Sequence, residues 1–384
     1  MNYDSAGRYL LIFDVGVTTQ SFTVGILNDG VNTDSLYVDM ELREITGRPA
    51  DEAILWIIDD TANFIADDDF ILGGAGDDIV LGDSGSITGD ATPRGDGTLW
   101  TGSITFTDGL GKDEIYGELN DDLLYGQLGT DLIDPGQGND GVDAGFGDDE
   151  IIVGIHNSIL DGGPDDDTIF SEYDGDFKLD AIPNQLTVDL GGSDESIFDL
   201  VAIENANLTG GDRANTFEVY FWDGGMEIDG LYNDDILRVE HNNLDMILQD
   251  TSVALANGSA YQFSSVENVI LVGGPGNNTL DASLYTKGAT LIGNDGDDTL
   301  LGGSGADTFV FTIDDLTGPN TDTVSGGGGI DTIDFSATTN AFDIDIDLGT
   351  TGVAQTVEPG LLDLILVTED IENILGGAGN DVLT

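Results

Sequence analysis

Acidic residues recur every nine residues between Asp108 and Phe170, and this spacing is the part of the sequence that could do chemistry. Seven consecutive ninemers align there without a gap: DGLGKDEIY, GELNDDLLY, GQLGTDLID, PGQGNDGVD, AGFGDDEII, VGIHNSILD and GGPDDDTIF. The sixth position is an acid in six of them, at Asp113, Asp122, Asp131, Asp140, Asp149 and Asp167, and is Ser158 in the other. Calcium takes about six to eight oxygen ligands, including carboxylates and main-chain carbonyls, and tolerates irregular geometry. The spacing therefore favours calcium binding.

Aliphatic residues and glycines keep the same register as the acids. The eighth position is aliphatic in every ninemer, at Ile115, Leu124, Ile133, Val142, Ile151, Leu160 and Ile169. The fourth position is Gly or Asn in five of the seven, with His156 and Asp165 as exceptions. Glycine adopts positive φ without steric cost, so it can form the turn and aim carbonyls inward. A fixed period of this kind indicates a solenoid.

Two ninemers would make one two-stranded coil, which places residue i beside residue i+18 at the strand spacing of about 4.8 Å. One column would then contain Asp113, Asp131, Asp149 and Asp167, and the opposite column Asp122 and Asp140. Carboxylates about 5 Å apart repel by about 3 kcal/mol per neighbouring pair at an effective dielectric constant of about 20. A dication bound between successive turns would turn this repulsion into a net attraction. Since Ser158 ends the second column, we expect it to be the weak point of the block.

The hydrophobic core of such a coil is thin. Burying one aliphatic side chain contributes about 1.5–3 kcal/mol, whereas ordering each of nine backbone residues costs roughly 1–2 kcal/mol. Main-chain hydrogen bonds recover only about 1 kcal/mol each. We therefore expect a ligand that binds the folded state selectively to be needed.

Composition supports a cation as that ligand. The 384 residues include 75 acids, 9 bases and 56 glycines, for a formal net charge of −66, which excludes nucleic acid as a partner. The absence of cysteine and the presence of two histidines leave zinc or copper almost no ligands. No apolar run approaches the roughly 20 residues of a membrane span, so we expect no transmembrane segment.

The repeat divides the chain into four parts. Residues 1–62 alternate apolar and polar side chains and predict a small β-rich N-terminal cap, or the tail of a preceding domain. Residues 63–170 predict a calcium-binding β-roll with a loop insertion at 85–107. Residues 171–272 predict irregular, longer coils with degenerate repeats, and residues 273–384 a second repeat region that we expect to be truncated at its end. The predicted fold class is all-β, a parallel β-roll or β-helix solenoid.

Several ninemers carry a family resemblance. GGAGDDIVL, GGSGADTFV and GGAGNDVLT match the G-G-x-G-x-D-x-U-x nonapeptide. On these residues the chain resembles the RTX (repeats-in-toxin) calcium-binding proteins, over roughly residues 63–384. The resemblance implies a right-handed parallel β-roll and calcium held by the sixth-position aspartate and by glycine-turn carbonyls. It also implies export by the type I secretion machinery.

The expected calcium ligands are the sixth-position aspartates and the turn glycines. They are Gly74, Gly76, Asp78, Gly109, Gly111, Asp113, Asp122, Gly129, Asp131, Gly138, Asp140, Gly147, Asp149, Asp167, Asp235, Gly296, Asp298, Gly305, Asp307, Asp331, Gly379 and Asp381. Where Ser158, Asn215 or Asn278 replaces the acid, and where His156 stands at the fourth position, we expect a weak or missing calcium. Glu204, Glu267 and Glu372, in AIENA, SVENV and DIENI, would either cap coils or bind calcium at irregular turns.

Two functions remain open from the sequence. The first is a secreted module, extracellular or on the bacterial cell surface, that folds on binding calcium and has a structural, adhesive or secretion-supporting role, with a possible cell-surface or matrix partner. The second is the repeat region of a larger secreted enzyme or toxin whose active domain lies outside this chain. The sequence has no H-E-x-x-H motif and no histidine that would complete a triad with Ser84, so we expect no enzymatic activity from it.

Overall fold

The computed structural model describes residues 111–384 except 192–194, 313–317 and 340–341, and before them only segments 2–3, 9–10, 53–54, 70–75, 78–82, 84–88 and 103–108. The chain separates into two units, Met1–Ser35 and Leu36–Thr384. In the first unit, β1 (Asn2–Tyr3) and β2 (Tyr9–Leu10) form an antiparallel pair. The rest of the predicted N-terminal cap lies largely outside the described residues.

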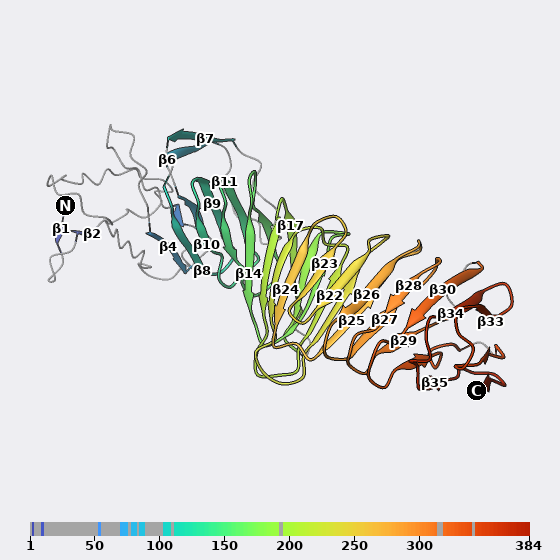
Figure 1. Ribbon diagram of the computed structural model, residues 1–384. Coiled ribbons are helices and arrows are strands. Elements are labelled where there is room, and N and C mark those ends of the chain that lie inside the picture. The colour runs from blue at the N-terminus through green and yellow to red at the C-terminus, as the bar shows by residue number, and fades with distance from the viewer. Residues whose placement is uncertain are drawn as a thin grey trace. The chain divides into compact units, whose positions relative to one another are not determined.

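Two sheets of 15 strands each make up most of the described part of the second unit (Figure 1). No helix occurs among the described residues, so the prediction of an all-β parallel solenoid is confirmed. Sheet 1 has the order β33 (Ala354–Glu358), β34 (Leu362–Leu366), β30 (Asn320–Ser325), β28 (Thr299–Leu301), β26 (Thr279–Leu284), β22 (Met246–Gln249), β23 (Ser252–Leu255), β24 (Ala260–Ser264), β20 (Gly225–Asp229), β18 (Asn205–Thr209), β14 (Thr168–Glu172), β12 (Glu150–Ile152), β10 (Leu132–Asp134), β8 (Glu114–Leu119) and β4 (Phe70–Ala75).

Sheet 2 stands opposite, and within the seven-ninemer block consecutive strands of the chain alternate between the two sheets. Its order is β3 (Ala53–Ile54), β5 (Asp78–Leu81), β9 (Leu123–Leu128), β11 (Gly141–Phe146), β13 (Ser158–Asp161), β17 (Glu195–Val201), β16 (Gln185–Asp189), β15 (Asp176–Asp180), β19 (Thr216–Tyr220), β21 (Ile236–Glu240), β25 (Asn268–Val272), β27 (Ala289–Ile292), β29 (Thr308–Val310), β31 (Thr332–Asp334) and β35 (Asn373–Leu375). Two short pairs complete the described strands, β6 (Ser84–Thr88) with β7 (Ser103–Asp108) and β32 (Asp345–Ile346) with β36 (Val382–Leu383). The pair β6–β7 is antiparallel and spans the predicted insertion, whose residues 89–102 lie outside the described part.

The seven-ninemer block has the predicted register of two ninemers per coil. Leu132 of β10 pairs with Glu114 and Glu150, and Val142 of β11 pairs with Leu124 and Leu160, so neighbours in each sheet are 18 residues apart. Because side chains alternate along a strand, one aliphatic residue per ninemer points inward. The eighth-position residues from Ile115 to Ile169 are all fully buried.

After Phe170 the parallel ladder is interrupted by antiparallel strands. In the first meander, β16 pairs antiparallel with both β15 and β17; in the second, β23 pairs antiparallel with β22 and β24. Each of these strands buries at least two side chains, such as Phe177 and Leu179 in β15. The ring of Phe177 stacks on Phe217 with centroids 5.1 Å apart. The meanders therefore extend the core of the ninemer block with aromatic as well as aliphatic side chains.

Candidate calcium sites

The sixth-position aspartates form the two columns that the sequence predicts. In the first column Asp131 Oδ1 accepts the main-chain N–H of Asp113 at 2.9 Å, and Asp149 Oδ1 accepts that of Asp131 at 2.7 Å. Asp167 Oδ1 accepts the N–H of Asp149 at 2.8 Å. In the second column Asp140 Oδ1 accepts the N–H of Asp122 at 2.9 Å. Each carboxylate thus binds the coil before its own.

The second column ends as the sequence predicts. Ser158 stands one coil after Asp140 and accepts the Asp140 N–H through its hydroxyl at 3.1 Å. The hydrogen bond of the ladder is kept at this position, but the negative charge is absent. The carboxylate column therefore ends at Asp140, and Ser158 closes it with an uncharged hydrogen-bond acceptor.

Several carboxylates use only one oxygen in this ladder. The second oxygen, Oδ2, is buried and accepts no hydrogen bond in Asp140, Asp149, Asp167, Asp235, Asp298 and Asp331. Leaving a buried polar atom unsatisfied costs about 1–3 kcal/mol, and more when the atom is charged. A cation beside Oδ2 would satisfy it.

A glycine at the first position of the ninemer makes room beside that oxygen. A Cβ on Gly162 would lie 2.5 Å from Asp167 Oδ2 and 2.5 Å from the carbonyl oxygen of Ala202 in the next coil. A Cβ on Gly117 would lie 2.6 Å from Asp122 Oδ2 and 2.6 Å from the Pro135 carbonyl oxygen. Four other first-position glycines likewise each border one aspartate Oδ2 and one main-chain carbonyl oxygen: Gly126, Gly230, Gly302 and Gly326. A carboxylate and a carbonyl that converge from adjacent coils fit the ligand preference of calcium.

Sequence reasoning missed these first-position glycines, because it considered glycine for its backbone freedom and not for the space it leaves. The signal was present, since glycine precedes the aspartate by five residues in GELNDDLLY, GQLGTDLID and GGPDDDTIF.

The fourth position adopts positive φ in several ninemers, although not at Gly138 or Gly305. Gly147 and Gly296 have φ of 126° and 125°, and Asn120, His156 and Asp165 have φ of 84°, 88° and 90°. Asn, Asp and His are the side chains most often found at positive φ. The two exceptions to the glycine-or-asparagine pattern, His156 and Asp165, are therefore residues that tolerate the same turn.

Burial and like charges act against ionisation in the columns. Burial, together with the neighbouring carboxylates of Asp131 and Asp167, raises the pKa of Asp149 to about 8, although the hydrogen bond from the Asp131 N–H acts in the opposite direction. Burial likewise raises the pKa of Asp298 to about 8 and those of Asp140 and Asp322 to about 7. Without a cation, the folded columns would therefore hold protons near neutral pH.

Three further columns contain the later predicted aspartates. Asp235 follows Asn215, Asp298 follows Asn278, and Asp331 follows Asp307, in each case accepting the preceding main-chain N–H at 2.7–2.8 Å. Asp322, which the sequence analysis missed, continues the column of Asp298 by accepting its N–H at 2.8 Å. The signal was the spacing in TDTVSG, where a valine follows Asp322 by two residues, although no glycine-rich turn precedes it.

The turn glycines that were predicted as ligands stack on the coil before them. A Cβ on Gly129, Gly138, Gly305 or Gly379 would collide with a carbonyl oxygen of that coil, respectively of Gly111, Asn120, Lys287 and Phe342. Asp381 is half-buried and accepts the Ile344 N–H at 3.0 Å. Gly76 and Gly109 lie outside the described residues, and Gly74 and Asp78 are described only through the backbone of β4 and β5.

A family profile described as the RTX calcium-binding nonapeptide repeat matches six segments, residues 66–86, 107–142, 143–172, 289–311, 316–334 and 368–384. The chain carries RTX calcium-binding repeats. These repeats bind Ca²⁺ at multiple sites. The matched segments contain the aspartates of four of the five columns but not Asp235. No curated protein shows significant similarity to the chain. No helix among the described residues is long and apolar enough to cross a membrane.

The RTX columns do not rely on clusters of acidic side chains. Among the described residues, no three Asp, Glu or His side chains come together in a way that could hold a metal. The residues that would hold calcium are instead the sixth-position aspartates together with main-chain carbonyls of adjacent coils.

Glutamates of the I-E-N and V-E-N segments end three of the columns. Glu204 Oε2 accepts the N–H of Asp167 at 3.0 Å, Glu267 Oε2 that of Asp235 at 3.1 Å, and Glu372 Oε2 that of Asp331 at 2.8 Å. The preceding residues Ile203, Val266 and Ile371 are buried and anchor each segment. These glutamates lie 32 to 41 residues after the aspartates whose N–H groups they accept. Glutamate, with its longer side chain, therefore takes the place of the next column aspartate where the following coil is longer than 18 residues.

Proposed function

We propose that this chain is a secreted structural module whose RTX coils fold when calcium binds outside the cell. The observation that carries the proposal is the set of buried carboxylate oxygens without hydrogen-bond partners, at Asp140, Asp149, Asp167, Asp235, Asp298 and Asp331. A stack that buries such oxygens is poorly stable by itself, and calcium is the partner that its carboxylate and carbonyl ligands favour.

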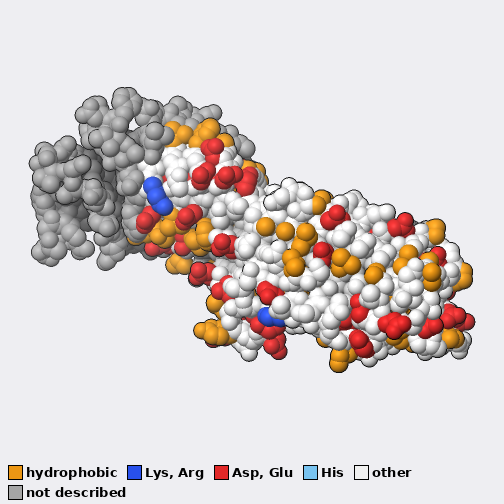
Figure 2. Space-filling view, in the orientation of Figure 1, with side chains coloured by type: hydrophobic (Ala, Val, Ile, Leu, Met, Phe, Trp, Pro, Cys, Tyr) orange, Lys and Arg blue, Asp and Glu red, His pale blue; other side chains and the backbone are white. Residues whose placement is uncertain are grey.

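The charge of the chain supports the same proposal. Figure 2 shows Asp and Glu side chains spread over the described face, with few Lys and Arg between them. With a formal net charge of −66, the compact state repels itself unless cations neutralise part of that charge. Low free calcium inside a cell would leave the chain expanded, and higher calcium outside would favour folding.

The stabilisation available from calcium is large enough to act as a switch. Each site adds about 2.7 kcal/mol when free calcium is about 100 times its dissociation constant. Because the net stability of a protein is typically about 5–15 kcal/mol, a few such sites decide between the folded and unfolded chain.

Circular dichroism of the chain in EGTA, and then in millimolar calcium, tests this function. We expect little β-structure in EGTA and a β-rich spectrum in calcium, with magnesium at the same concentration as a control that restores much less, since it demands a small octahedral site. Equal β-content with and without calcium would refute the proposal.

The biological role that we propose is structural or adhesive, with export by type I secretion and no catalysis by this chain. The columns of Asp and main-chain oxygens would supply charge and rigidity to such a module. Binding of the folded chain to cell surfaces or matrix, compared in calcium and EGTA, would test the adhesive role.

A further inference from the structure

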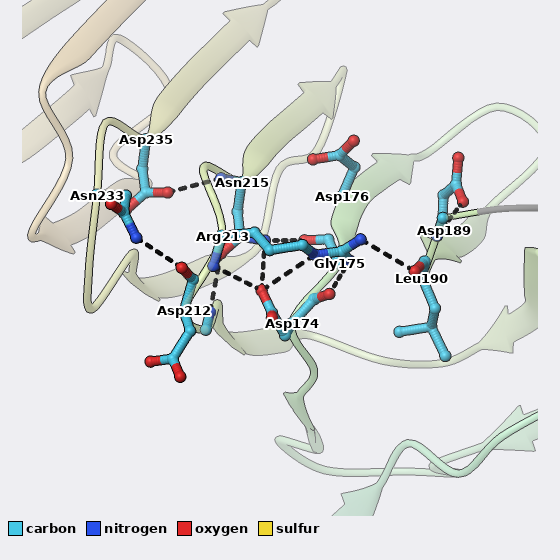
Figure 3. A network of polar contacts seen from close by, with 12 residues as sticks. Asp174, Gly175, Asp176, Asp189, Leu190, Asp212, Arg213, Asn215, Asn233 and Asp235 are labelled. Carbon is cyan, nitrogen blue, oxygen red and sulfur yellow. Dashed lines mark hydrogen bonds and ion pairs between the residues drawn. The ribbon is translucent and has the colours of Figure 1, made fainter.

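The ninemer GGDRANTFE, residues 210–218, departs from the RTX pattern at two positions. Arg213 replaces the fourth-position glycine and Asn215 replaces the sixth-position acid. It follows the first meander, so the coil before it is the antiparallel strand pair β15–β16 and not a regular ninemer. Figure 3 shows that Arg213 reaches back to the segment of Asp174 and to Leu190.

The guanidinium of Arg213 contacts three oxygens from two segments of the preceding coil. Its Nη1 donates to the Leu190 carbonyl oxygen at 3.1 Å, and its Nη2 donates to the Asp174 carbonyl oxygen. Its Nε lies 3.3 Å from Asp174 Oδ1, which also accepts the Arg213 main-chain N–H at 2.9 Å. Two carbonyls and a carboxylate are the kind of oxygen ligands that calcium would take at an RTX turn.

Asn215 removes the buried oxygen that marks the other turns. Its Oδ1 accepts the Gly211 N–H at 2.8 Å, and its Nδ2 donates to the Gly175 carbonyl oxygen at 2.9 Å. Its N–H still donates to Asp235 Oδ1 at 2.7 Å, so the column continues above it. Both polar atoms of the Asn215 amide therefore have hydrogen-bond partners. Asp235, one coil later, has a buried Oδ2 without a partner.

The pKa of Asp174 agrees with a turn that is neutralised internally. Burial would raise that pKa, but the Arg213 N–H, the Asn215 amide and the guanidinium together hold it below its usual value. Burial instead raises the pKa of Asp149, Asp167 and Asp235 in the columns. Asp174 therefore stays charged beside a cation that the chain itself supplies.

We propose that Arg213 and Asn215 take the place of a calcium ion at this turn, so that the column restarts after the first meander without metal. The formal charge at the turn is the same in both cases. Arg213 and Asn215 together carry one positive charge, and a glycine, an aspartate and a bound dication also sum to one positive charge. The inference rests on the proposed function, since it specifies which RTX turns calcium occupies.

The decisive experiment is to restore the pattern in the full chain. R213G/N215D converts the ninemer to GGDGADTFE, and we expect it to bind one more calcium per chain than wild type, by elemental analysis after dialysis against millimolar calcium. N215D alone should bind no more than wild type, because the guanidinium remains and neutralises the new carboxylate. A folded R213G/N215D with the wild-type count would overturn the inference.

Asn278 provides a matched control. It also starts a column after a meander, with Nδ2 donating to the Leu244 carbonyl oxygen at 3.3 Å and Oδ1 accepting the Gly274 N–H at 2.8 Å. Its ninemer, GGPGNNTLD, already has glycine at the fourth position, Gly276. N278D alone should therefore gain one calcium where N215D does not. Equal counts in N215D and N278D would overturn the inference, even if R213G/N215D failed to fold.

These outcomes separate the inference from the proposed function. A wild-type count near zero would refute calcium-dependent folding itself. A wild-type chain that binds several calcium ions, with no gain in R213G/N215D, would refute only the role of Arg213 and Asn215.

Discussion

Replacing Asp149 by asparagine should change stability in opposite directions with and without calcium. Asp149 lies inside the first column, where its Oδ1 accepts the Asp131 N–H at 2.7 Å and its own N–H donates to Asp167 Oδ1 at 2.8 Å. Asparagine retains both hydrogen bonds, because its Oδ1 can accept in the same place. The substitution therefore removes the charge and the second carboxylate oxygen and leaves the ladder in place.

The magnitude follows from these two losses. In calcium, a lost site costs about 2.7 kcal/mol at about 100 times its dissociation constant, and Asp149 borders two coil junctions, so we expect a loss of about 3–5 kcal/mol. Without calcium at pH 7, the wild-type folded state keeps the Asp149 carboxyl protonated, although its pKa in the unfolded chain is about 3.9. Protonating such a carboxyl at pH 7 costs about 4 kcal/mol, and asparagine removes this cost. About 1–3 kcal/mol is lost again because the buried amide N–H gains no acceptor. The net gain without calcium is about 1–3 kcal/mol.

Urea unfolding in saturating calcium, and osmolyte-induced folding in EGTA, would measure the two changes by circular dichroism. Asp148→Asn is the matched control, because Asp148 is exposed, adjacent, and accepts the Asp166 N–H at 3.1 Å. We expect it to change stability by less than about 0.5 kcal/mol in both conditions. A similar loss for Asp149→Asn with and without calcium would refute the reasoning, because the carboxylate would then be acting only as a hydrogen-bond acceptor.

Three further outcomes are expected. Gly162→Ala should lower the number of bound calcium ions by one, measured by elemental analysis, because its Cβ would occupy the space between Asp167 Oδ2 and the Ala202 carbonyl; an unchanged count would contradict the assigned site. Without calcium, the folded fraction should rise as the pH falls from about 8 to 5, followed by circular dichroism in EGTA. The raised pKa values of about 8 at Asp149 and Asp298 mean that the folded state binds protons the unfolded state lacks, so this stability is lost as the pH rises through that range. A chain that unfolds on acidification in EGTA would contradict that sign. Glu267→Ala should lower the free energy of unfolding in calcium by about 1–3 kcal/mol, because it leaves the Asp235 N–H without its acceptor. Glu267→Gln should lower it by less in the same urea titration. Equal losses would show that the charge, not the hydrogen bond, matters.

The regular part of this protein could be predicted from the sequence because its structure repeats locally. A constant period of nine residues specifies which residues stack, so the burial of Ile133 and the column from Asp113 to Asp167 follow without any knowledge of distant contacts. The same period, with its acids and glycines, specifies calcium as the chemistry.

The irregular part depended on tertiary structure. Where the meanders lengthen the coil, the stacked residues are 40 positions apart, as for Asp176 and Thr216, and no period in the sequence specifies that distance. The positions of Glu204, Glu267 and Glu372 at the ends of columns, and of Arg213 against Asp174, are set by how the antiparallel strands pack onto the stack. The physical reason is that regular repeats stack at one constant sequence spacing. An inserted strand changes that spacing, and its contacts are set only by how the folded chain packs.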